Sequence, residues 1–562
     1  MTTKTVIQNI VLPIAGYGDI GPLYVKDYSG DFPITLSRGE SADLRTFFNL
    51  FPSEKYREYA GLDHVMLRLD CDGNPNIEIF RYRDTECISE SQRYNGDLRL
   101  DLCDECLLGI VILADNADVT VRSGCFYSDK ETINDVHLAH VICTYRREKD
   151  VTEKLDLICS KCRQDPLMKD NLTVYVIDNG QSLDYHDKLV RLIHSPNLGG
   201  SGGFTRGMIE AVNDGVSTHV TLNDDDAMLD PETIHRTIAF YMLISFEKKE
   251  TILGGTIFRR DEPTVVYEAG AYYRNGEIFS NGDMDPITIE GCMALDKVVH
   301  GCEEGSYFAW CYTTMPIEVV RRYGFSLPLF FQFDDIDYGL RVKDVPKVTM
   351  CGLLVWHAFV NVYSVNKMYF GMRNRLIISA SNSLIDMKMM KKAFLDIMAN
   401  LGYYRYLIAE AQLQALRDIR AGPDKVFRMI TKGYRLFDEY KYEEPMPEKR
   451  LTAKHIRHSS WFIYLTFNGV LFPSIGDYET DMSDHDIYHY YRKGRVFYKS
   501  EDGKEIVCKR SAIRTISLTF KILWNIGLIS IRKGKITKLY SEAAKEYRSE
   551  NSWQKLFKVD RS

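Results

Sequence analysis

The chain has 562 residues, of which 45% are hydrophobic and 27% are charged, and its formal net charge is -7. This length is too great for one ordinary hydrophobic core and predicts roughly two to four domains. The composition is that of a globular protein, and the net negative charge gives no reason to expect a nucleic-acid partner.

The first residues lack the basic start, apolar centre and small-residue cleavage site of a signal peptide. No run approaches the ~18 consecutive apolar residues typical of a bilayer-spanning helix, so we expect no segment to span a membrane. The 13 cysteines are an odd number without regular spacing, which fits a reduced cytoplasmic protein better than a disulfide scaffold. Two CxxC pairs, Cys103/Cys106 and Cys159/Cys162, leave structural zinc as an alternative, although one pair falls on an expected helix in a different domain from the other.

Residues 1–135 are expected to form an N-terminal domain of mostly β structure, because short apolar stretches alternate there with turn residues. Helical periodicity is found mainly at Ser41–Leu50. The pattern predicts a β-sandwich or jelly roll, which is usually a binding or architectural module. The expected strands are Val6–Pro13, His64–Leu69, Asn76–Tyr82, Leu107–Leu113, Val119–Arg122 and Cys125–Tyr127.

The pattern changes near His137, and residues 136–380 are expected to form an α/β domain. A buried-type strand at 140–145 precedes a charged helical stretch from Lys149 to Arg163, and a second apolar strand follows at Leu172–Ile177. Strand, helix and strand with continuous apolar runs are the signature of a parallel sheet. Ligands bind such sheets at the carboxyl ends of the strands. We therefore expect the polar residues at these ends to lie together: Tyr145 to Arg147, Asp178, and Asp224 to Asp226.

The acidic triplet Asp224-Asp225-Asp226 follows a further apolar strand, His219–Leu222. If the chain stays extended, Asp224 and Asp226 point the same way. Carboxylate oxygens suit Mg²⁺ or Mn²⁺, which bridge to diphosphates and neutralise charge on a nucleotide leaving group. The alternative is an acidic turn before the helix that Asp230-Pro231-Glu232 opens.

A glycine-rich run from Asn197 to Gly207 leads into another helix. Its glycines let the backbone approach a ligand closely, and a helix N-terminus favours anions. The run lacks the spacing and the lysine of a P-loop, and a tight structural turn is the alternative.

A second acidic stretch, Asp334-Asp335-Ile336-Asp337, follows an aromatic run about a hundred residues later. Asp334 and Asp335 precede a helical stretch, whose positive end favours ionised carboxylates. An ionised Asp beside an acceptor hydroxyl can act as a general base, whereas helix capping alone is the alternative. His357 follows an apolar strand and would by itself be a core residue, but beside the acidic triplet it becomes a third metal ligand.

Residues 381–562 are expected to form a helical domain. Helix-forming runs extend from Met387 to Ala421 and stop at Gly422-Pro423. Further on, apolar residues recur at helical spacing beside basic ones. This pattern predicts either a basic amphipathic helix on an anionic membrane surface or a C-terminal helix docked on the protein. The apolar residues are Ile513, Ile516, Phe520, Leu523 and Trp524, and the basic residues are Lys521, Arg532, Lys533, Lys535 and Lys538.

Several motifs, in this order, resemble glycosyltransferase family 2, which has the GT-A fold with a Rossmann-like mixed sheet. The resemblance is closest to the polymerising galactofuranosyltransferases of mycobacterial cell-wall galactan, whose β-sandwich, GT-A domain and helical C-terminal region match the three regions expected here. Phe47–Pro52 in the first domain also looks like that family. The motifs are Asn197-Leu198-Gly199-Gly200 with Gly202-Gly203-Phe204 and Arg206, Asp224-Asp225-Asp226, Pro328-Leu329-Phe330 with Asp334–Arg341, Trp356-His357, and Arg373-Asn374-Arg375-Leu376.

The resemblance implies an inverting, metal-dependent transfer of galactofuranose from UDP-galactofuranose to a galactofuranosyl-containing glycan or lipid-linked glycan. Asp335 would be the general base, with Asp334 beside it, and Asp224, Asp226 and His357 would hold Mn²⁺ or Mg²⁺. It also implies a homo-oligomer. Donor contacts, including the uridine part and the sugar pocket, would come from Arg147, Asp178, Asn197, Gly200, Asp224, Asp225, Tyr307 and Trp310.

The chain departs from the family at two positions. Trp310-Cys311 stands where the family has a Trp-Trp pair, and Gly371 stands where it has a His. Both lie near the expected donor or acceptor surface, so the acceptor and linkage stay open. Two other functions also stay open. One is a GT-A enzyme with a rhamnosyl or glucosyl donor, because GT-A sites bind mainly the nucleotide and the metal. The other is a non-catalytic carbohydrate-binding protein.

Overall fold

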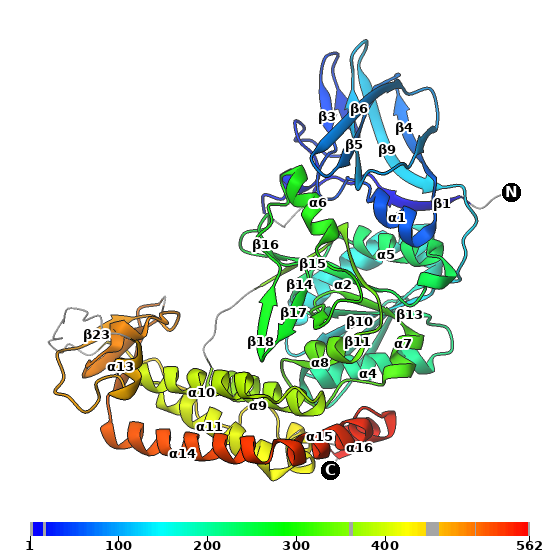
Figure 1. The fold of residues 1–562 in the computed structure, drawn as a ribbon. Helices are drawn as coiled ribbons and strands as arrows, with labels where there is room; N and C mark the ends of the chain where they lie inside the picture. The colour runs from blue at the N-terminus through cyan, green and yellow to red at the C-terminus, as the bar shows by residue number, and fades with distance from the viewer. Residues whose placement is uncertain (1–3, 15–17, 359–363, 446–459, 501, 560–562) are drawn as a thin grey trace.

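The computed structural model describes residues 4–14, 18–358, 364–445, 460–500 and 502–559 (Figure 1). Three regions follow one another along the chain. A β-rich N-terminal region, blue in Figure 1, lies on the α/β middle region, and the helices of the C-terminal region lie along the opposite side of that middle region.

The N-terminal region contains two antiparallel sheets, one of five strands and one of four. Side chains from both sheets, among them Val65 and Ile110, belong to one buried apolar cluster, which confirms the predicted sandwich. The same cluster continues into one face of the middle sheet. The first sheet contains β1 (Thr5–Asn9), β9 (Val119–Ser128), β4 (His64–Asp72), β7 (Leu98–Asp101) and β2 (Ile34–Leu36), and the second contains β3 (Ser41–Asp43), β8 (Leu107–Leu113), β5 (Asn76–Arg83) and β6 (Glu86–Arg93).

The helix predicted at Ser41–Leu50 is wrong. Its first residues form strand β3, which pairs with β8, and the residues after it form turns. The apolar side chains there pack against other parts of the chain, since the ring of Phe47 meets that of Phe258 at 5.3 Å. Asn49 Nδ2 donates to the carbonyl of Tyr24 at 2.6 Å and so supports the turn from outside. The apolar residues of this segment are therefore spaced as in a helix because each one packs against a distant part of the chain. The short helices of this region are η1 (Gly21–Leu23) and α1 (Ser53–Ala60).

The middle region is built on a ten-stranded mixed sheet. Strands β11, β10 and β13 are parallel, as predicted from their apolar runs, and β12, which was not predicted, extends the parallel set beside β11. Strand β21 then pairs antiparallel with both β13 and β15. Thr144 of β10 lies beside Asp178 of β11, and Cys143 lies beside Asp224 of β13, so the carboxyl ends of these strands coincide. The strands are β10 (Leu138–Thr144), β11 (Leu172–Asp178), β12 (Val190–His194), β13 (His219–Asp224), β14 (Ala227–Met228), β15 (Ile252–Arg259), β16 (Val266–Glu268), β19 (His300–Gly301), β21 (Thr313–Pro316) and β22 (Lys347–His357).

Helices cover this sheet, and a separate three-stranded sheet stands beside it. The helices are α2 (Glu148–Gln164), α3 (Pro166–Asn171), α4 (Gly199–Asn213), α5 (Glu232–Leu243), η2 (Phe246–Lys248), α6 (Ile289–Lys297), α7 (Ile317–Tyr323) and α8 (Asp334–Arg341). The small sheet contains β18 (Glu277–Ser280), β17 (Ala271–Arg274) and β20 (Ser306–Tyr307).

The C-terminal region is helical, as predicted, and also carries a small sheet that we did not predict. The predicted stop is confirmed, since α11 ends at Ala421 and α12 begins at Pro423 after Gly422. Our domain boundaries, 1–135, 136–380 and 381–562, stay predictions. The elements are α9 (Val365–Ser381), α10 (Met387–Gly402), α11 (Tyr406–Ala421), α12 (Pro423–Arg428), η3 (Met429–Lys432), α13 (Ser460–Leu465), β23 (Tyr478–Thr480), η4 (Ile487–Tyr490), β24 (Arg495–Lys499), β25 (Glu505–Lys509), α14 (Ala512–Ile531), α15 (Lys533–Tyr547) and α16 (Glu550–Val559).

Helix α14 bears on the expectation that no segment spans a membrane, which stays a prediction. Within the described residues it alone is long and apolar enough to cross a membrane, judged by length and composition. Scattered Ser, Thr and Lys residues interrupt its apolar runs, so counting consecutive apolar residues missed it. A single such helix is weak evidence for a membrane span, and one face of α14, including Leu518, Ile522 and Ile529, is buried against the protein.

Candidate active site

The acidic triplet lies at the carboxyl end of β13, where a buried lysine supports it. Lys154 of α2 places its Nζ 2.9 Å from Asn223 Oδ1 and also donates to the carbonyl of Asp224. Asn223 in turn donates to the carbonyl of Cys311 at 2.6 Å. Burial lowers the pKa of Lys154 to about 8, with the three aspartates opposing this effect. Hydrogen bonds therefore link the end of β13 to α2 and to the backbone at Cys311.

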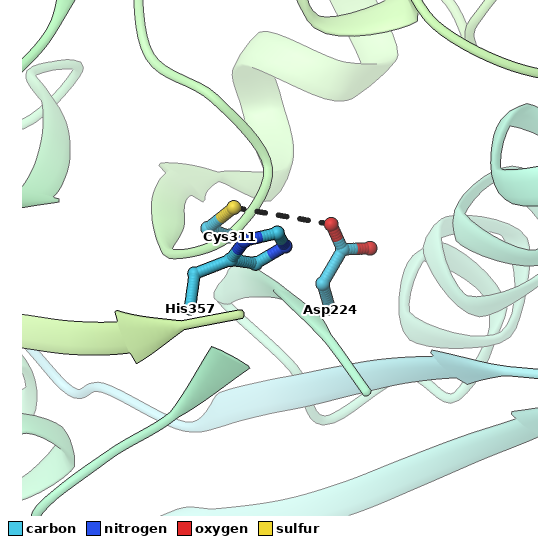
Figure 2. Close-up of side chains that lie close together, drawn as sticks. All are labelled: Asp224, Cys311 and His357. Atoms are coloured by element: carbon cyan, nitrogen blue, oxygen red, sulfur yellow. Dashed lines mark hydrogen bonds between the residues drawn. The ribbon is translucent and has the colours of Figure 1, made fainter. Parts of the chain in front are cut away.

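Two of the three predicted metal ligands are in direct contact. His357, the last residue of β22, holds its Nε2 3.1 Å from Asp226 Oδ1. Figure 2 shows Asp224, Cys311 and His357 converging, and one potential ligand atom of each lies within 4.8 Å of the others. The Cys311 Sγ is 3.9 Å from Asp224 Oδ2. Carboxylates and an imidazole suit Mn²⁺ or Mg²⁺, so the side chains fit such an ion. Sequence reasoning noted Cys311 only as a departure from the family.

The carboxylates of the triplet have different proton affinities. Burial, followed by the charge of Asp226, raises the pKa of Asp224 to about 7. Burial also raises the pKa of Asp225. Burial acts in the same direction on Asp226, but the hydrogen bond and charge of His357 outweigh it and hold the Asp226 pKa below its ordinary value. Burial penalises the charged forms of these neighbouring carboxylates. A bound divalent cation would stabilise their ionised forms.

Basic side chains border the triplet. Arg147, just before α2, holds its Nη2 3.1 Å from Asp226 Oδ2 and its Nε 3.6 Å from Asp225 Oδ1. Lys367 of α9, which the sequence reasoning missed, has a pKa lowered by burial and by the charge of Arg147, while Asp226 opposes the shift. This border is a suitable place for a diphosphate beside the cation.

The loop that enters α8 has an uncommon backbone. Phe330, Gln332 and Phe333 have φ values of 71°, 63° and 69°, a region that non-glycine residues adopt rarely. Asn374 of α9 supports it, since its Nδ2 lies 3.2, 2.6 and 3.0 Å from the carbonyl oxygens of Leu329, Phe331 and Gln332. The Arg-Asn motif of α9 therefore has a structural reason to be present, because it fixes the loop that carries Asp334 and Asp335.

The glycine-rich run lies against this loop. Gly199 has φ of 74°, and a Cβ there would be 1.8 Å from the carbonyl oxygen of Phe330, so only glycine fits. The Phe330 amide donates to Ser201 Oγ at 2.9 Å. A Cβ at Gly200 would be 3.8 Å from Asp334 Oδ2. The glycine-rich run therefore forms a tight structural turn, which was the alternative to a ligand-binding role. It also borders the second acidic stretch.

Asp334 and Asp335 begin α8 and have raised proton affinities. Burial raises the pKa of Asp334 to about 6. Burial, and then the charge of Asp334, raises the pKa of Asp335 well above its ordinary value. The charge of Asp224 contributes to this shift, and that of Asp334 contributes to the shift at Asp224. The two acidic clusters, distant in sequence, therefore form one electrostatic site.

The remaining predicted donor residues are engaged with the protein. Asp178 accepts hydrogen bonds from the amides of Gly180, Ser182 and Leu183 at 2.7–2.9 Å and shapes the loop after β11. Asn197 Oδ1 accepts from the Gly199 amide at 3.0 Å.

Trp310 and Tyr307 form a buried wall next to α8. The Trp310 ring meets the edge of Tyr338 at 5.9 Å, and Tyr307 packs on Gly339 so closely that a Cβ there would be 2.2 Å away. The ligand-binding roles of both residues stay predictions.

Glu268, at the end of β16, is a site residue that sequence reasoning missed. It is buried, its Oε2 accepts a hydrogen bond from Ser280 Oγ at 2.6 Å, and burial raises its pKa. Its charge contributes to the raised pKa values of Asp335 and Tyr307. One glutamate in a short edge strand carries no motif, so the sequence offered no signal for it.

Comparisons with known proteins agree with this architecture. Residues 8–103 match the family described as galactofuranosyltransferase 2 N-terminal, and residues 140–294 match glycosyl transferase family 2, which confirms the predicted GT-A fold class. The chain is 26% identical over 479 residues to galactofuranosyltransferase GlfT2 of Mycobacterium tuberculosis, covering 76% of this chain and 74% of that protein. It is 25% identical over 480 residues to GlfT2 of Mycolicibacterium smegmatis, covering 76% and 72%.

Among solved structures, the mannosyltransferase PcManGT of Pyrobaculum calidifontis, in complex with GDP-Man and Mn²⁺, aligns with 12% identity and a TM-score of 0.28. The alignment covers 52% of this chain and 79% of that one. A TM-score this low supports no conclusion about the present chain.

Proposed function

We propose that this chain, which carries a glycosyl transferase family 2 domain behind a galactofuranosyltransferase 2 N-terminal domain, transfers galactofuranose from UDP-galactofuranose to a galactofuranosyl-containing glycan. The relatives named galactofuranosyltransferase support the choice of sugar. The observation that carries the reaction is that two carboxylate clusters act on each other at one site: Asp224 lies with His357 in a group suited to a cation, and its charge contributes to the raised pKa of Asp335.

The acidic triplet serves the leaving group in this proposal. Asp224, Asp226 and His357 hold Mn²⁺ or Mg²⁺, which supplies positive charge to the diphosphate when it is bound. Arg147 and Lys367 add positive charge from the protein at the border of the same cluster. Asp225, which is 3.6 Å from Arg147, orients that guanidinium.

Asp335 serves the acceptor. Its raised pKa makes it a stronger proton acceptor than an ordinary carboxylate, while its place at the start of α8 leaves it partly exposed. It takes the proton of the acceptor hydroxyl as that oxygen bonds to the anomeric carbon. The bond from that carbon to the diphosphate breaks, and its electron pair leaves with UDP. One direct displacement inverts the anomeric centre.

The other predicted residues border the donor and the sugar. Asp178, Asn197 and Gly200 shape the two loops on the donor side, and Tyr307 and Trp310 form the wall of the sugar pocket next to α8. Buried aromatic walls suit the apolar faces of sugar rings.

A donor panel tests the proposal. UDP or nucleotide release is measured with UDP-galactofuranose, UDP-galactopyranose, UDP-glucose and dTDP-rhamnose, with Mn²⁺ and a galactofuranosyl acceptor. Activity restricted to UDP-galactofuranose supports the proposal, and preference for another donor supports the alternative GT-A enzyme. No turnover with any donor by folded protein that still binds the glycan would favour the non-catalytic carbohydrate-binding protein.

The proposal extends to location and assembly. An enzyme acting on a lipid-linked glycan at the inner face of a cell membrane would touch that membrane, and α14 is the candidate element, with basic residues from Arg532 to Lys538 following it. A homo-oligomer without a nucleic-acid partner completes the proposal. Membrane fractionation and light scattering of the purified protein test these two points.

A further inference from the structure

A short segment of the C-terminal region, residues 433–440, lies on the first turns of α9 without forming a helix or a strand. We call it the strap. The side chain of Asn366, which is completely buried, holds this segment. Its Oδ1 accepts from the amides of Leu436 and Phe437 at 2.7 and 3.0 Å, and its Nδ2 donates to the carbonyl of Phe437 at 2.9 Å. One amide side chain therefore fixes the path of the strap backbone over α9.

The carboxylate of Glu439, in the strap, caps the N-terminus of α9. It accepts hydrogen bonds from the amides of Val365 and Asn366 at 2.6 and 3.0 Å and from the hydroxyl of Ser364. Burial opposes the ionised form, but these hydrogen bonds outweigh it and hold the pKa of Glu439 below its ordinary value. The first turn of α9 contains no acidic residue of its own. The strap therefore supplies the negative charge that the positive end of a helix favours.

The ring of Tyr434 joins α9 to the loop that enters α8. It lies nearly parallel to the rings of Phe370 on α9 and Phe330 in the loop, with centroids 5.9 and 6.3 Å away. Those two rings stack on each other at 5.4 Å. The ring of Phe331 meets Tyr434 at 74° and 5.8 Å, and the Tyr434 hydroxyl is 3.0 Å from Ser364 Oγ. Tyr434 thus contacts α9 and two consecutive residues of the loop.

The strap is also anchored beyond α9. Tyr440, its last residue, accepts at its hydroxyl from the amide of Leu407 in α11, at 3.0 Å. Shortly after the strap, the backbone of Glu443 exchanges two hydrogen bonds with that of Glu505 in β25, at 2.9 and 2.8 Å. The strap therefore connects α11 and the small C-terminal sheet to the loop before α8.

We propose that Tyr434 and Glu439 are positioning residues for the transfer reaction: the strap holds α9 and the loop together and thereby keeps Asp335 at the acceptor hydroxyl. This inference rests on the proposed role of Asp335 as the base. Phe330 and two other residues of the loop have positive φ values, which non-glycine residues keep only where surrounding contacts impose them. Asn374 supplies such contacts from α9, and the ring of Tyr434 supplies them from the strap. Phe330 and Asp335 are few positions apart, so loss of the strap displaces the base.

Steady-state kinetics of the full-length protein test the proposal. We expect Tyr434→Ala to lower kcat roughly tenfold with little change in the KM for the donor, because a small displacement of a catalytic group is costly. Tyr434→Phe keeps the ring and should retain nearly the full rate. Glu439→Gln removes the charge at the helix end and should lower kcat about threefold. Asp438→Asn removes the same charge from an exposed neighbour and is the matched control.

Hydrogen–deuterium exchange gives a readout that does not depend on turnover. Tyr434→Ala should speed amide exchange several-fold at residues 330–336, because the loop loses a stabilising contact. Exchange in β13, which leads to the acidic triplet, should stay as in the unmodified protein, and so should the affinity for Mn²⁺ measured by electron paramagnetic resonance. If Tyr434→Ala does not fold, Glu439→Gln, at an exposed side chain, provides the same comparison.

Three results would overturn the proposal. One is a kcat for Tyr434→Ala and Glu439→Gln equal to that of Asp438→Asn. Another is unchanged exchange of the loop in Tyr434→Ala, and the third is faster exchange without any loss of kcat. Failure of the proposed function gives a different result, since the unmodified protein would then release no UDP from UDP-galactofuranose. Exchange at residues 330–336 would still decide whether the strap orders the loop.

Discussion

Arg548, just after α15, donates from Nη2 to Asp337 Oδ1 over 2.7 Å although 211 positions separate the two residues. Arg341, one turn further along α8, holds its Nε 3.2 Å from the other oxygen of Asp337. The Asp337 side chain is completely buried. The third carboxylate of the acidic stretch therefore anchors α8 to the C-terminal helices.

Replacing Asp337 should destabilise the protein. Asp337→Asn leaves two largely buried guanidinium groups without their counter-charge, and removing one partner of a buried ion pair costs about 3–5 kcal/mol. We take the lower end, about 3 kcal/mol, because Arg548 keeps some contact with water. Thermal and denaturant unfolding measure the effect, with Asp344→Asn, which follows α8 on the surface, as the control. Equal stability of the two variants would contradict the anchoring role.

Replacing Asp335 should stop the reaction without loss of donor binding. Asp335→Asn removes the proton acceptor, and general-base catalysis contributes about 10²–10⁴ in rate. Calorimetry with UDP and Mn²⁺ should give nearly the same affinity as the unmodified protein. If UDP affinity fell as far as the rate does, Asp335 would belong to the donor site.

The rate should depend on pH through Asp335. Its pKa is raised, first by burial and then by Asp334, so the carboxylate is protonated and inactive at a pH where an ordinary aspartate would be ionised. Transfer should therefore rise with pH through this elevated pKa. Asp334→Asn removes the neighbouring negative charge and should move the acidic limb of the kcat profile to lower pH. An unmoved limb would mean that another group controls it.

Metal binding should distinguish His357 from Cys311. Chelation should abolish transfer, and Mn²⁺ or Mg²⁺ should restore it. We expect His357→Ala to weaken Mn²⁺ binding strongly and Cys311→Ala to leave it almost unchanged, because these ions prefer oxygen and nitrogen over sulfur and burial raises the pKa of the Cys311 thiol. Electron paramagnetic resonance of bound Mn²⁺ measures both. A strong loss in Cys311→Ala would identify the thiol as a ligand and indicate a softer metal.

The amide of Asn374 should position Asp334 and Asp335. Asn374→Ala removes the donor of the Phe331 and Gln332 carbonyls, whereas the Leu329 carbonyl still accepts from Arg373 Nη2 at 2.5 Å. Each unsatisfied buried group costs about 1–3 kcal/mol. We expect kcat to fall roughly tenfold to a hundredfold with little change in KM, because even a small shift of the loop would move the base out of its reacting position. Asn400→Ala, a buried amide on α10 bonded to Gln412, is the control for stability alone. Equal kcat in the two variants would exclude a positioning role.

Local patterns in the sequence were enough for much of the fold. Continuous apolar runs predicted the parallel strands β10, β11 and β13, because strands covered on both faces need apolar side chains at successive positions. Gly422-Pro423 predicted the end of α11. Parallel strands end at one edge, so the meeting of Arg147 with the acidic triplet also followed from the sequence. Where apolar spacing had a tertiary cause, as at 41–50, the same reasoning produced a helix that does not exist.

From the sequence we predicted which residues carry the chemistry: the acidic triplet, His357 and the Asp334-Asp335 pair. The tertiary structure was needed to show how these residues are held and which of them pair with other charged groups. It separated Asp335 from Asp337, gave Asn374 and Gly199 their roles around the strained loop, and added Cys311, Glu268 and Lys367 to the site. Periodicity along the chain reports only which residues of one helix or strand are buried. A hydrogen bond between Asp337 and Arg548 depends on packing that brings together positions far apart, and leaves no repeating trace along the sequence.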